Sequence, residues 1–165
     1  MKDEIFAKPA VGTIIEKEDN GEKYILIQTR HKEGAEIENG MLEIPAGKIR
    51  EYENIFDTLR REVLEETGLT VTKITGEKNI IEDDVNSYKV ITFVPFCSTQ
   101  NLSGGYSIIL QTFICEAEGD LLDNSNETKD IHWISIDELK KLYINNRDTF
   151  YPLHVNAIKK YLCIQ

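Results

Sequence analysis

The hydrophobic and polar positions in the first part of the chain predict two antiparallel strands and a loop. Residues 11–15 and 24–28 are rich in β-branched and aromatic side chains, and the Asn20-Gly21 pair between them is a strong hairpin signal. Residues 31–40 are polar and contain two glycines, which indicates a loop. The fold is therefore expected to begin with a β-hairpin.

The next part of the chain has the periodicity of an α-helix, after a short strand expected at 41–44. Asn54 or Glu53 can open this helix, and Gly68 can end it in the left-handed backbone conformation. At roughly 100° per residue, one apolar stripe contains Ile55, Phe56, Leu59 and Val63.

The second half of the chain predicts more strands, two polar loops and two helices. Asp137 is expected to cap a short helix at 138–143, and Pro152 suits the first turn of a last helix. Polar residues at 97–105 and 120–130 indicate loops. The expected strands are 71–74, 88–96, 106–116 and 131–136.

Strands on both sides of a central helix, several of them joined as hairpins, imply an α/β fold with a mixed β-sheet and helices packed on it. The chain has 165 residues and contains no internal repeat or linker. A single domain over residues 1–165 is therefore expected.

Composition and charge narrow the functional classes. The chain carries 29 acidic and 19 basic residues, a net charge of −10, which argues against nucleic acid as a partner but not against a phosphorylated small molecule. We find no signal-peptide pattern and no apolar stretch long enough for a membrane span, so we expect a cytoplasmic protein with no membrane partner. The three cysteines form no Cys-x-x-Cys pair and are expected to be buried, reduced thiols.

Three carboxylates on the central helix are the strongest candidates for chemistry. Glu62, Glu65 and Glu66 are spaced i, i+3 and i+4, which brings side chains together on one helix face. Because like charges repel, either Arg61 and solvent or a hard cation must offset this cluster, and carboxylate oxygens suit Mg²⁺, Mn²⁺ or Ca²⁺. Glu66 also lies close to the direction of Ile55 on the apolar stripe, so a partner inside the protein is expected for it.

The segment from Gly47 to Leu69 resembles the Nudix box. The pattern is glycine, five residues, glutamate, seven residues, then Arg-Glu-apolar-any-Glu-Glu-any-Gly-apolar, and every position matches. Seven fixed identities at about 7% each would coincide by chance at on the order of one start position in a hundred million. The matching residues are Gly47, Glu53, Arg61, Glu62, Val63, Glu65, Glu66, Gly68 and Leu69.

The resemblance implies a Nudix-like α/β/α sandwich and metal-dependent hydrolysis of a phosphoric anhydride. It implies that Glu62, Glu65 and Glu66 are ligands of Mg²⁺ or Mn²⁺, and that the carbonyl of Ala46 reaches a metal. A strained turn that only Gly47 permits is expected beside them, and simple turn chemistry is the alternative explanation of that glycine.

The resemblance also implies positioning and catalytic residues around these ligands. Arg61 is expected to hold Glu53 through a guanidinium–carboxylate pair. Many Nudix enzymes add a carboxylate from a loop outside the box, as a ligand or general base. Glu127 fits that position, and Glu116 and Glu118 are its rivals.

Histidines and aromatic residues outside the box have two interpretations. His132 and His154 are expected to be structural, because neither has metal-ligand spacing. Four aromatic residues could stack on a base or fill the core, and the core is the favoured interpretation: Tyr88, Phe93, Phe96 and Tyr106.

The expected function is hydrolysis of the pyrophosphate in a nucleoside diphosphate linked to another moiety. Ala46, where nucleoside triphosphatases of the family commonly have glycine, favours ADP-ribose or a nucleotide sugar. The alternatives are a nucleoside triphosphate pyrophosphatase that sanitises nucleotides, a non-catalytic Nudix-like sensor that binds a nucleotide, and a diphosphate isomerase, which the isolated cysteines disfavour. The expected partner is a small nucleoside diphosphate derivative, and a homodimer whose second subunit adds contacts is compatible with the sequence.

Overall fold

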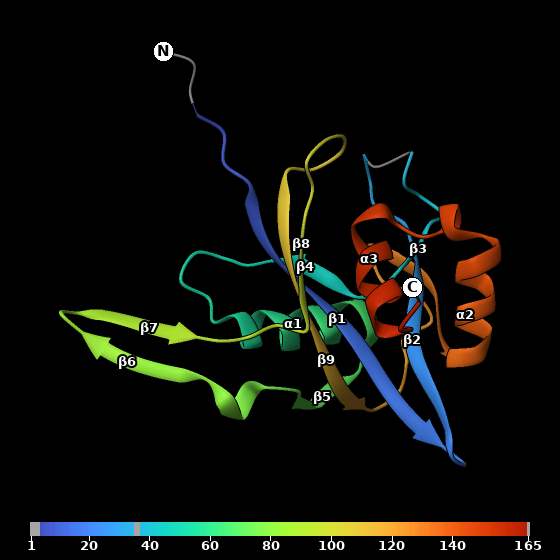
Figure 1. The fold of residues 1–165 in the computed structure, drawn as a ribbon, viewed down its shortest axis with the longest axis horizontal. Coiled ribbons are helices and arrows are strands. Elements are labelled where there is room, and N and C mark those ends of the chain that lie inside the picture. Colours follow the sequence, from blue (N-terminus) through green and yellow to red (C-terminus); the bar gives the residue numbers. More distant parts are fainter. Residues whose placement is uncertain (1–3, 35–36, 165) are drawn as a thin grey trace.

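Figure 1 shows the computed structural model of the chain, a twisted β-sheet with helices on both faces and a projecting hairpin. The structure describes residues 4–34 and 37–164. The helices are α1 (Ile55–Thr67), α2 (Ile136–Asn145) and α3 (Pro152–Tyr161), with short 3₁₀ turns at Glu77–Asn79 and Arg147–Thr149. The strands are β1 (Lys8–Asp19), β2 (Glu22–Arg30), β3 (Leu42–Glu43), β4 (Ala46–Lys48), β5 (Thr70–Ile74), β6 (Ile81–Val85), β7 (Tyr88–Thr92), β8 (Cys97–Gln100), β9 (Ile108–Glu118) and β10 (Thr128–Ser135).

The main sheet is mixed and has β1 at its centre. Its order is β10-β2-β1-β9-β5, with β3, β4 and β8 paired to β2, β1 and β9. Strand β1 runs parallel to β9 and antiparallel to β2 and β4. The β1–β2 hairpin turns at Asn20 and Gly21, which both have positive φ (51° and 80°), as expected of an Asn-Gly hairpin.

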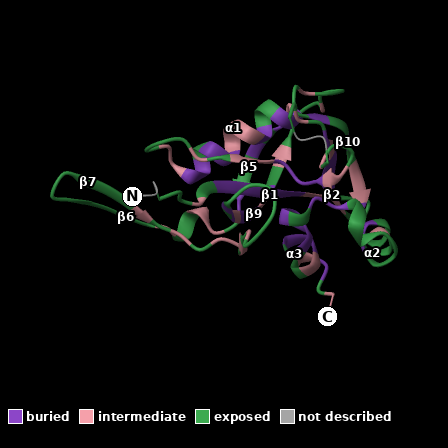
Figure 2. Cartoon of the chain, turned by 90° about the horizontal axis from the view of Figure 1, so that it is seen from above, coloured by how far each residue is buried: buried purple, intermediate pink, exposed green. Residues whose placement is uncertain are grey.

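The two faces of the sheet bury two separate cores. On one face Val11 and Ile15 of β1 pack under α1, and on the other face Ile14 of the same strand packs under α2 and α3. This alternation follows from the period of two along a strand. Figure 2 shows the buried sheet between α1 and the other two helices, and this arrangement confirms the predicted α/β/α sandwich.

The caps of α1 fix where this helix begins and ends. Asn54 opens the helix, and its side chain accepts a hydrogen bond from the Phe56 N–H. Gly68 ends it with φ 80°, and its N–H donates to the Leu64 carbonyl. Both predicted ends are confirmed.

The predicted N-cap of helix α2 is wrong. Ser135, and not Asp137, is the N-cap, and it forms a capping box with Glu138. Asp137 lies in the first helical turn instead, where its charge favours the helix dipole. Pro152 begins α3, as predicted.

The strand predictions for residues 88–105 need two corrections. Strand β7 ends at Thr92, short of Pro95, which has no N–H for a ladder. It pairs with β6 in a hairpin of mostly exposed residues that projects from the sheet (Figure 2). Cys97–Gln100, predicted to lie in a loop, forms β8 and pairs with β9 alone. Its polar sequence is that of a half-exposed edge strand.

Within the described chain, no helix is both long enough and apolar enough to cross a bilayer. The three cysteines are free thiols, of which Cys115 is buried and Cys163 is exposed. The prediction of burial therefore holds for Cys115, whereas Cys97 is half-buried and the prediction is wrong for Cys163.

Candidate active site

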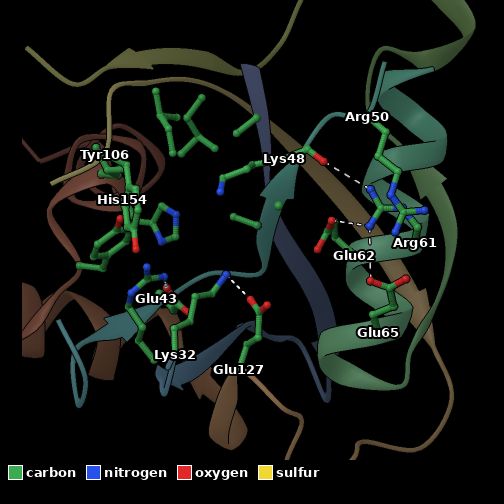
Figure 3. Close-up of a pocket in the computed structure, with 18 residues that line it drawn as sticks. Lys32, Glu43, Lys48, Arg50, Arg61, Glu62, Glu65, Tyr106, Glu127 and His154 are labelled. Atoms are coloured by element: carbon green, nitrogen blue, oxygen red, sulfur yellow. Dashed lines mark hydrogen bonds and ion pairs between the residues drawn. The ribbon is translucent and has the colours of Figure 1, made fainter. Parts of the chain in front are cut away.

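A cleft of about 440 Å³ lies between α1 and α3 (Figure 3), within the size range of small-molecule sites. Figure 3 shows Arg61, Glu62 and Glu65 at one side, and Tyr106 and His154 at the other. The acidic lining residues are Glu43, Glu62, Glu65 and Glu127; the basic ones are Arg30, Lys32, Lys48, Arg50 and Arg61; the others are Ala10, Ala46, Gly47, Tyr106, Ile108, Leu110, Tyr151, Leu153 and His154.

Strand β4 brings the start of the box against α1. Gly47 pairs with Val11 of β1, and a Cβ at this position would overlap the carboxylate of Glu62. Gly47 does not have a positive φ, so the predicted strained turn is wrong. The glycine is needed because a carboxylate lies directly against the backbone.

Arg61 is the centre of an ion-pair network on α1. Its Nε and Nη2 donate to the two carboxylate oxygens of Glu53 at 2.8 and 2.9 Å, so the expected bidentate contact is present. This contact lowers the pKa of Glu53 to about 2. Arg61 also pairs with Glu62 and, at 3.3 Å, with Glu65. The guanidinium therefore offsets part of the like-charge repulsion along the helix.

Glu66 points away from this network and into the protein. Its side chain is 4% exposed, whereas that of Glu65 is 54% exposed. The Glu66 carboxylate accepts hydrogen bonds from Gln28 Nε2 at 2.8 Å and from the Ala46 N–H at 3.2 Å. Burial raises its pKa to about 8, and the nearby carboxylate of Glu43 adds to this shift. The internal partner expected for Glu66 is thus present.

The predicted metal ligands fit a hard divalent cation in chemistry but do not converge on one point. No three acidic, histidine or cysteine side chains of residues 4–34 and 37–164 form a ready cluster. Glu62 and Glu65 pair with Arg61, and Glu66 hydrogen-bonds to neutral donors only. A buried carboxylate without an ion-pair partner among the described residues is a costly arrangement that a cation would relieve.

Of the three candidate carboxylates outside the box, Glu127 lines the cleft. It lies just before β10 and pairs with Lys32, as Figure 3 shows. Glu116 pairs instead with Lys73 at 2.6 Å, and it borders another groove together with Glu118. The structure thus brings Glu127 to the box and keeps its rivals away from it.

The structure adds a buried charge pair that sequence reasoning missed. Arg30 Nη1 donates to Glu43 Oε2 at 3.0 Å, and both residues are almost fully buried. The guanidinium lies 4.2 Å from the centre of the Tyr151 ring. The available signal was an arginine at the end of the mostly buried strand β2, where a charge needs a partner.

The predicted core position is confirmed for two of the four aromatic residues. Phe93 and Phe96 pack against the two cores, as expected. Tyr88 is exposed on the projecting hairpin, so its predicted core position is wrong. Tyr106 is also partly exposed and lines the cleft, with Lys48 Nζ 5.6 Å from its ring centre.

Comparisons with known proteins place this fold and box in one family. A family model described as NUDIX domain matches residues 7–153. Among curated proteins, no sequence matches the chain.

Solved structures of low sequence identity share the fold. A NUDIX-family hydrolase from Clostridium perfringens has a TM-score of 0.65 at 17% identity, over 97% of this chain and 99% of that chain. The NUDIX domain of Shewanella oneidensis NrtR, crystallised with ADP ribose, has a TM-score of 0.64 at 13% identity, over 97% and 89% of the two chains. For a MutT/nudix family protein from Enterococcus faecalis the values are 0.59 and 15%, and the match covers 82% of this chain but only 46% of that chain.

The family match spans most of the chain and contains the complete box. The chain therefore belongs to the Nudix family of pyrophosphohydrolases, enzymes that act on nucleoside diphosphate derivatives.

Proposed function

We propose that this chain is a divalent-metal-dependent hydrolase that cleaves the pyrophosphate of ADP-ribose or a nucleotide sugar. The observation that carries the proposal is the composition of one cleft. It joins the carboxylates of α1 to basic side chains and to an apolar surface, as a molecule with a diphosphate between two different ends requires. The preference for ADP-ribose is supported by Ala46 in the box and by the neighbour that was crystallised with ADP ribose.

The carboxylate side of the cleft would hold the metal. The residues that would bind Mg²⁺ or Mn²⁺ are Glu62, Glu65, Glu66 and the carbonyl of Ala46, all oxygen donors. When bound, such ions make a water molecule more acidic and offset the negative charge that develops on the diphosphate. Arg61 would keep its bidentate contact with Glu53 and so hold the preceding loop against α1.

Basic side chains that line the same cleft would bind the phosphates. Lys32, Lys48 and Arg50 line the cleft of a protein whose net charge is −10, so their positive charge is concentrated where a diphosphate would lie. Glu127 would accept a proton from the attacking water, and its ion pair with Lys32 holds the carboxylate at the cleft. Attack of water on one phosphorus then breaks the P–O–P bond and leaves two phosphate monoesters.

The test is product analysis by mass spectrometry. ADP-ribose, nucleotide sugars, dinucleoside polyphosphates and nucleoside triphosphates would each be incubated with the protein and Mg²⁺ or Mn²⁺. The proposal predicts AMP and ribose 5-phosphate from ADP-ribose. Preferential release of pyrophosphate from triphosphates would favour the nucleotide-sanitising alternative, and tight binding without any turnover would favour the sensor.

A further inference from the structure

His154 lies at the end of the cleft that the box does not reach. It is in the first turn of α3, is only 2% exposed, and lines the cleft. Figure 3 shows its ring on the side opposite Glu62 and Glu65. The proposed hydrolysis at the diphosphate leaves this side chain without a role.

A backbone contact fixes the tautomer of His154. The Ile44 N–H donates to the imidazole Nδ1 at 3.2 Å, so Nδ1 must be the unprotonated nitrogen and Nε2 must carry the proton. Burial, together with the charges of Arg30 and Lys32, lowers the pKa of His154 to about 3. The ring is therefore a neutral donor with one N–H left to use.

That remaining N–H lacks an acceptor within the protein. Nε2 hydrogen-bonds to none of the residues in 4–34 and 37–164, and the ring packs edge-to-face with Tyr151, at a centroid distance of 5.1 Å. Among the described residues, Nε2 is not one of the fully buried polar atoms that lack a partner, so it is accessible from the cleft that His154 lines. A ligand acceptor in the cleft can therefore pair with this donor.

The surroundings of His154 suit a flat apolar group. A third hydrophobic cluster, separate from the two cores, lines the cleft beside it, and we call this cluster the apolar wall: Ala10, Ile108, Leu110, Tyr151 and Leu153. Tyr106 stands at its rim. In a nucleoside diphosphate derivative the base is the flat apolar part, whereas a sugar presents hydroxyl groups that would lose their hydration there.

We propose that His154 recognises the nucleobase, by donating its Nε2–H to a ring nitrogen or carbonyl of a base seated against the apolar wall. The inference rests on the proposed function, because it takes the substrate to be a nucleoside diphosphate derivative. It assigns base selection to α3, far in sequence from the box.

Two substitutions of His154 distinguish a role in base recognition from a purely structural role. In His154→Asn the side-chain oxygen replaces Nδ1 as the acceptor of the Ile44 N–H, and the Nε2 donor is removed. In His154→Gln the amide nitrogen takes the place of Nε2, and the acceptor for Ile44 is lost. The assay uses ADP-, GDP-, UDP- and CDP-glucose, which differ only in the base.

The wild-type protein is expected to prefer one base by about 10- to 100-fold in kcat/KM, the range of one matched hydrogen bond. His154→Asn should reduce this preference to within about threefold, through KM, with an unfolding temperature close to that of the wild type. His154→Gln should keep the preference and unfold at a lower temperature. If His154 has only a structural role, the substitutions should change the unfolding temperature and leave the base preference unaltered.

The proposal is wrong if the wild type shows no base preference or if His154→Asn retains it. Failure of the proposed function would look different, because the wild type would then hydrolyse neither ADP-ribose nor any of the four nucleotide sugars. In that case calorimetric titration with ADP, GDP, UDP and CDP decides. A base preference in affinity that His154→Asn removes supports recognition by His154, and equal affinities overturn it.

Discussion

The two sides of the cleft are built in different ways. The α1 side comes from one contiguous segment, in which Arg61 contacts Glu53, Glu62 and Glu65 within a short stretch of chain. The α3 side is assembled from β1, β9 and α3, and its hydrogen bond between Ile44 and His154 spans 110 positions. The comparison teaches that the cluster of candidate metal ligands on α1 is encoded within a short segment, whereas the proposed base site depends on the tertiary fold.

The largest effect is expected on the α3 side, where a charge pair is buried. Arg30→Met would leave Glu43 buried without its partner and should destabilise the protein by about 3–5 kcal/mol. Urea unfolding measures this. The double variant Arg30→Met/Glu43→Gln is the control and should recover part of the loss. If the single variant is as stable as the wild type, the pair does not support this side of the cleft.

On the α1 side, a change in an exposed carboxylate should affect turnover and leave stability intact. Glu65→Gln is expected to lower kcat by about 100- to 1000-fold, as loss of an electrostatic contact to the reacting groups does. Its metal-free unfolding temperature should equal or exceed that of the wild type, because repulsion is relieved. Glu116→Gln, at an exposed carboxylate outside the cleft, is the matched control. An unaltered rate in Glu65→Gln would refute its assignment as a ligand.

Gly47→Ala tests the contact between β4 and α1. The added Cβ would displace the Glu62 carboxylate, a flexible group, so we expect about tenfold lower activity with little change in stability. Gly12→Ala is the control in the adjacent strand, because its Cβ would meet Leu110 at 3.4 Å, an ordinary contact. Equal activities of the two variants would contradict the close approach of Glu62 to the backbone.

The last prediction concerns the pH dependence of stability and the buried Glu66. Its folded-state pKa of about 8 lies above the ordinary value of 4.5, so the unfolded chain releases this proton first as pH rises. In chelator, Glu66 should therefore lower stability progressively between about pH 4.5 and pH 8. Urea unfolding of wild type and Glu66→Gln at pH 5 and pH 8 measures this. The variant should gain stability relative to the wild type at pH 8, and an identical pH dependence would contradict the burial of a charge there.

Sequence reasoning succeeded for several turns and caps whose interactions are short in range. The Asn20-Gly21 turn and the Asn54 and Gly68 caps depend on a few neighbouring residues, and all are present. It failed for β8, because an edge strand with one partner can be polar.

The α3 side of the cleft could not be predicted from the sequence for a different reason. The sequence does not show whether both ring nitrogens of a histidine have hydrogen-bond partners. The donor to His154 Nδ1 is the Ile44 N–H, which lies 110 positions away in the chain. The tautomer and the free donor follow only from the packing of α3 against β3 and the residues after it.

Arg61 has a consequence for how the protein is made. The guanidinium serves as an internal counter-ion to Glu53, Glu62 and Glu65, so the acidic helix can form in a newly synthesised chain before any dissolved ion arrives. In the proposed metal-bound enzyme, Glu62 and Glu65 would exchange Arg61 for the cation, and Glu53 would keep the arginine in place.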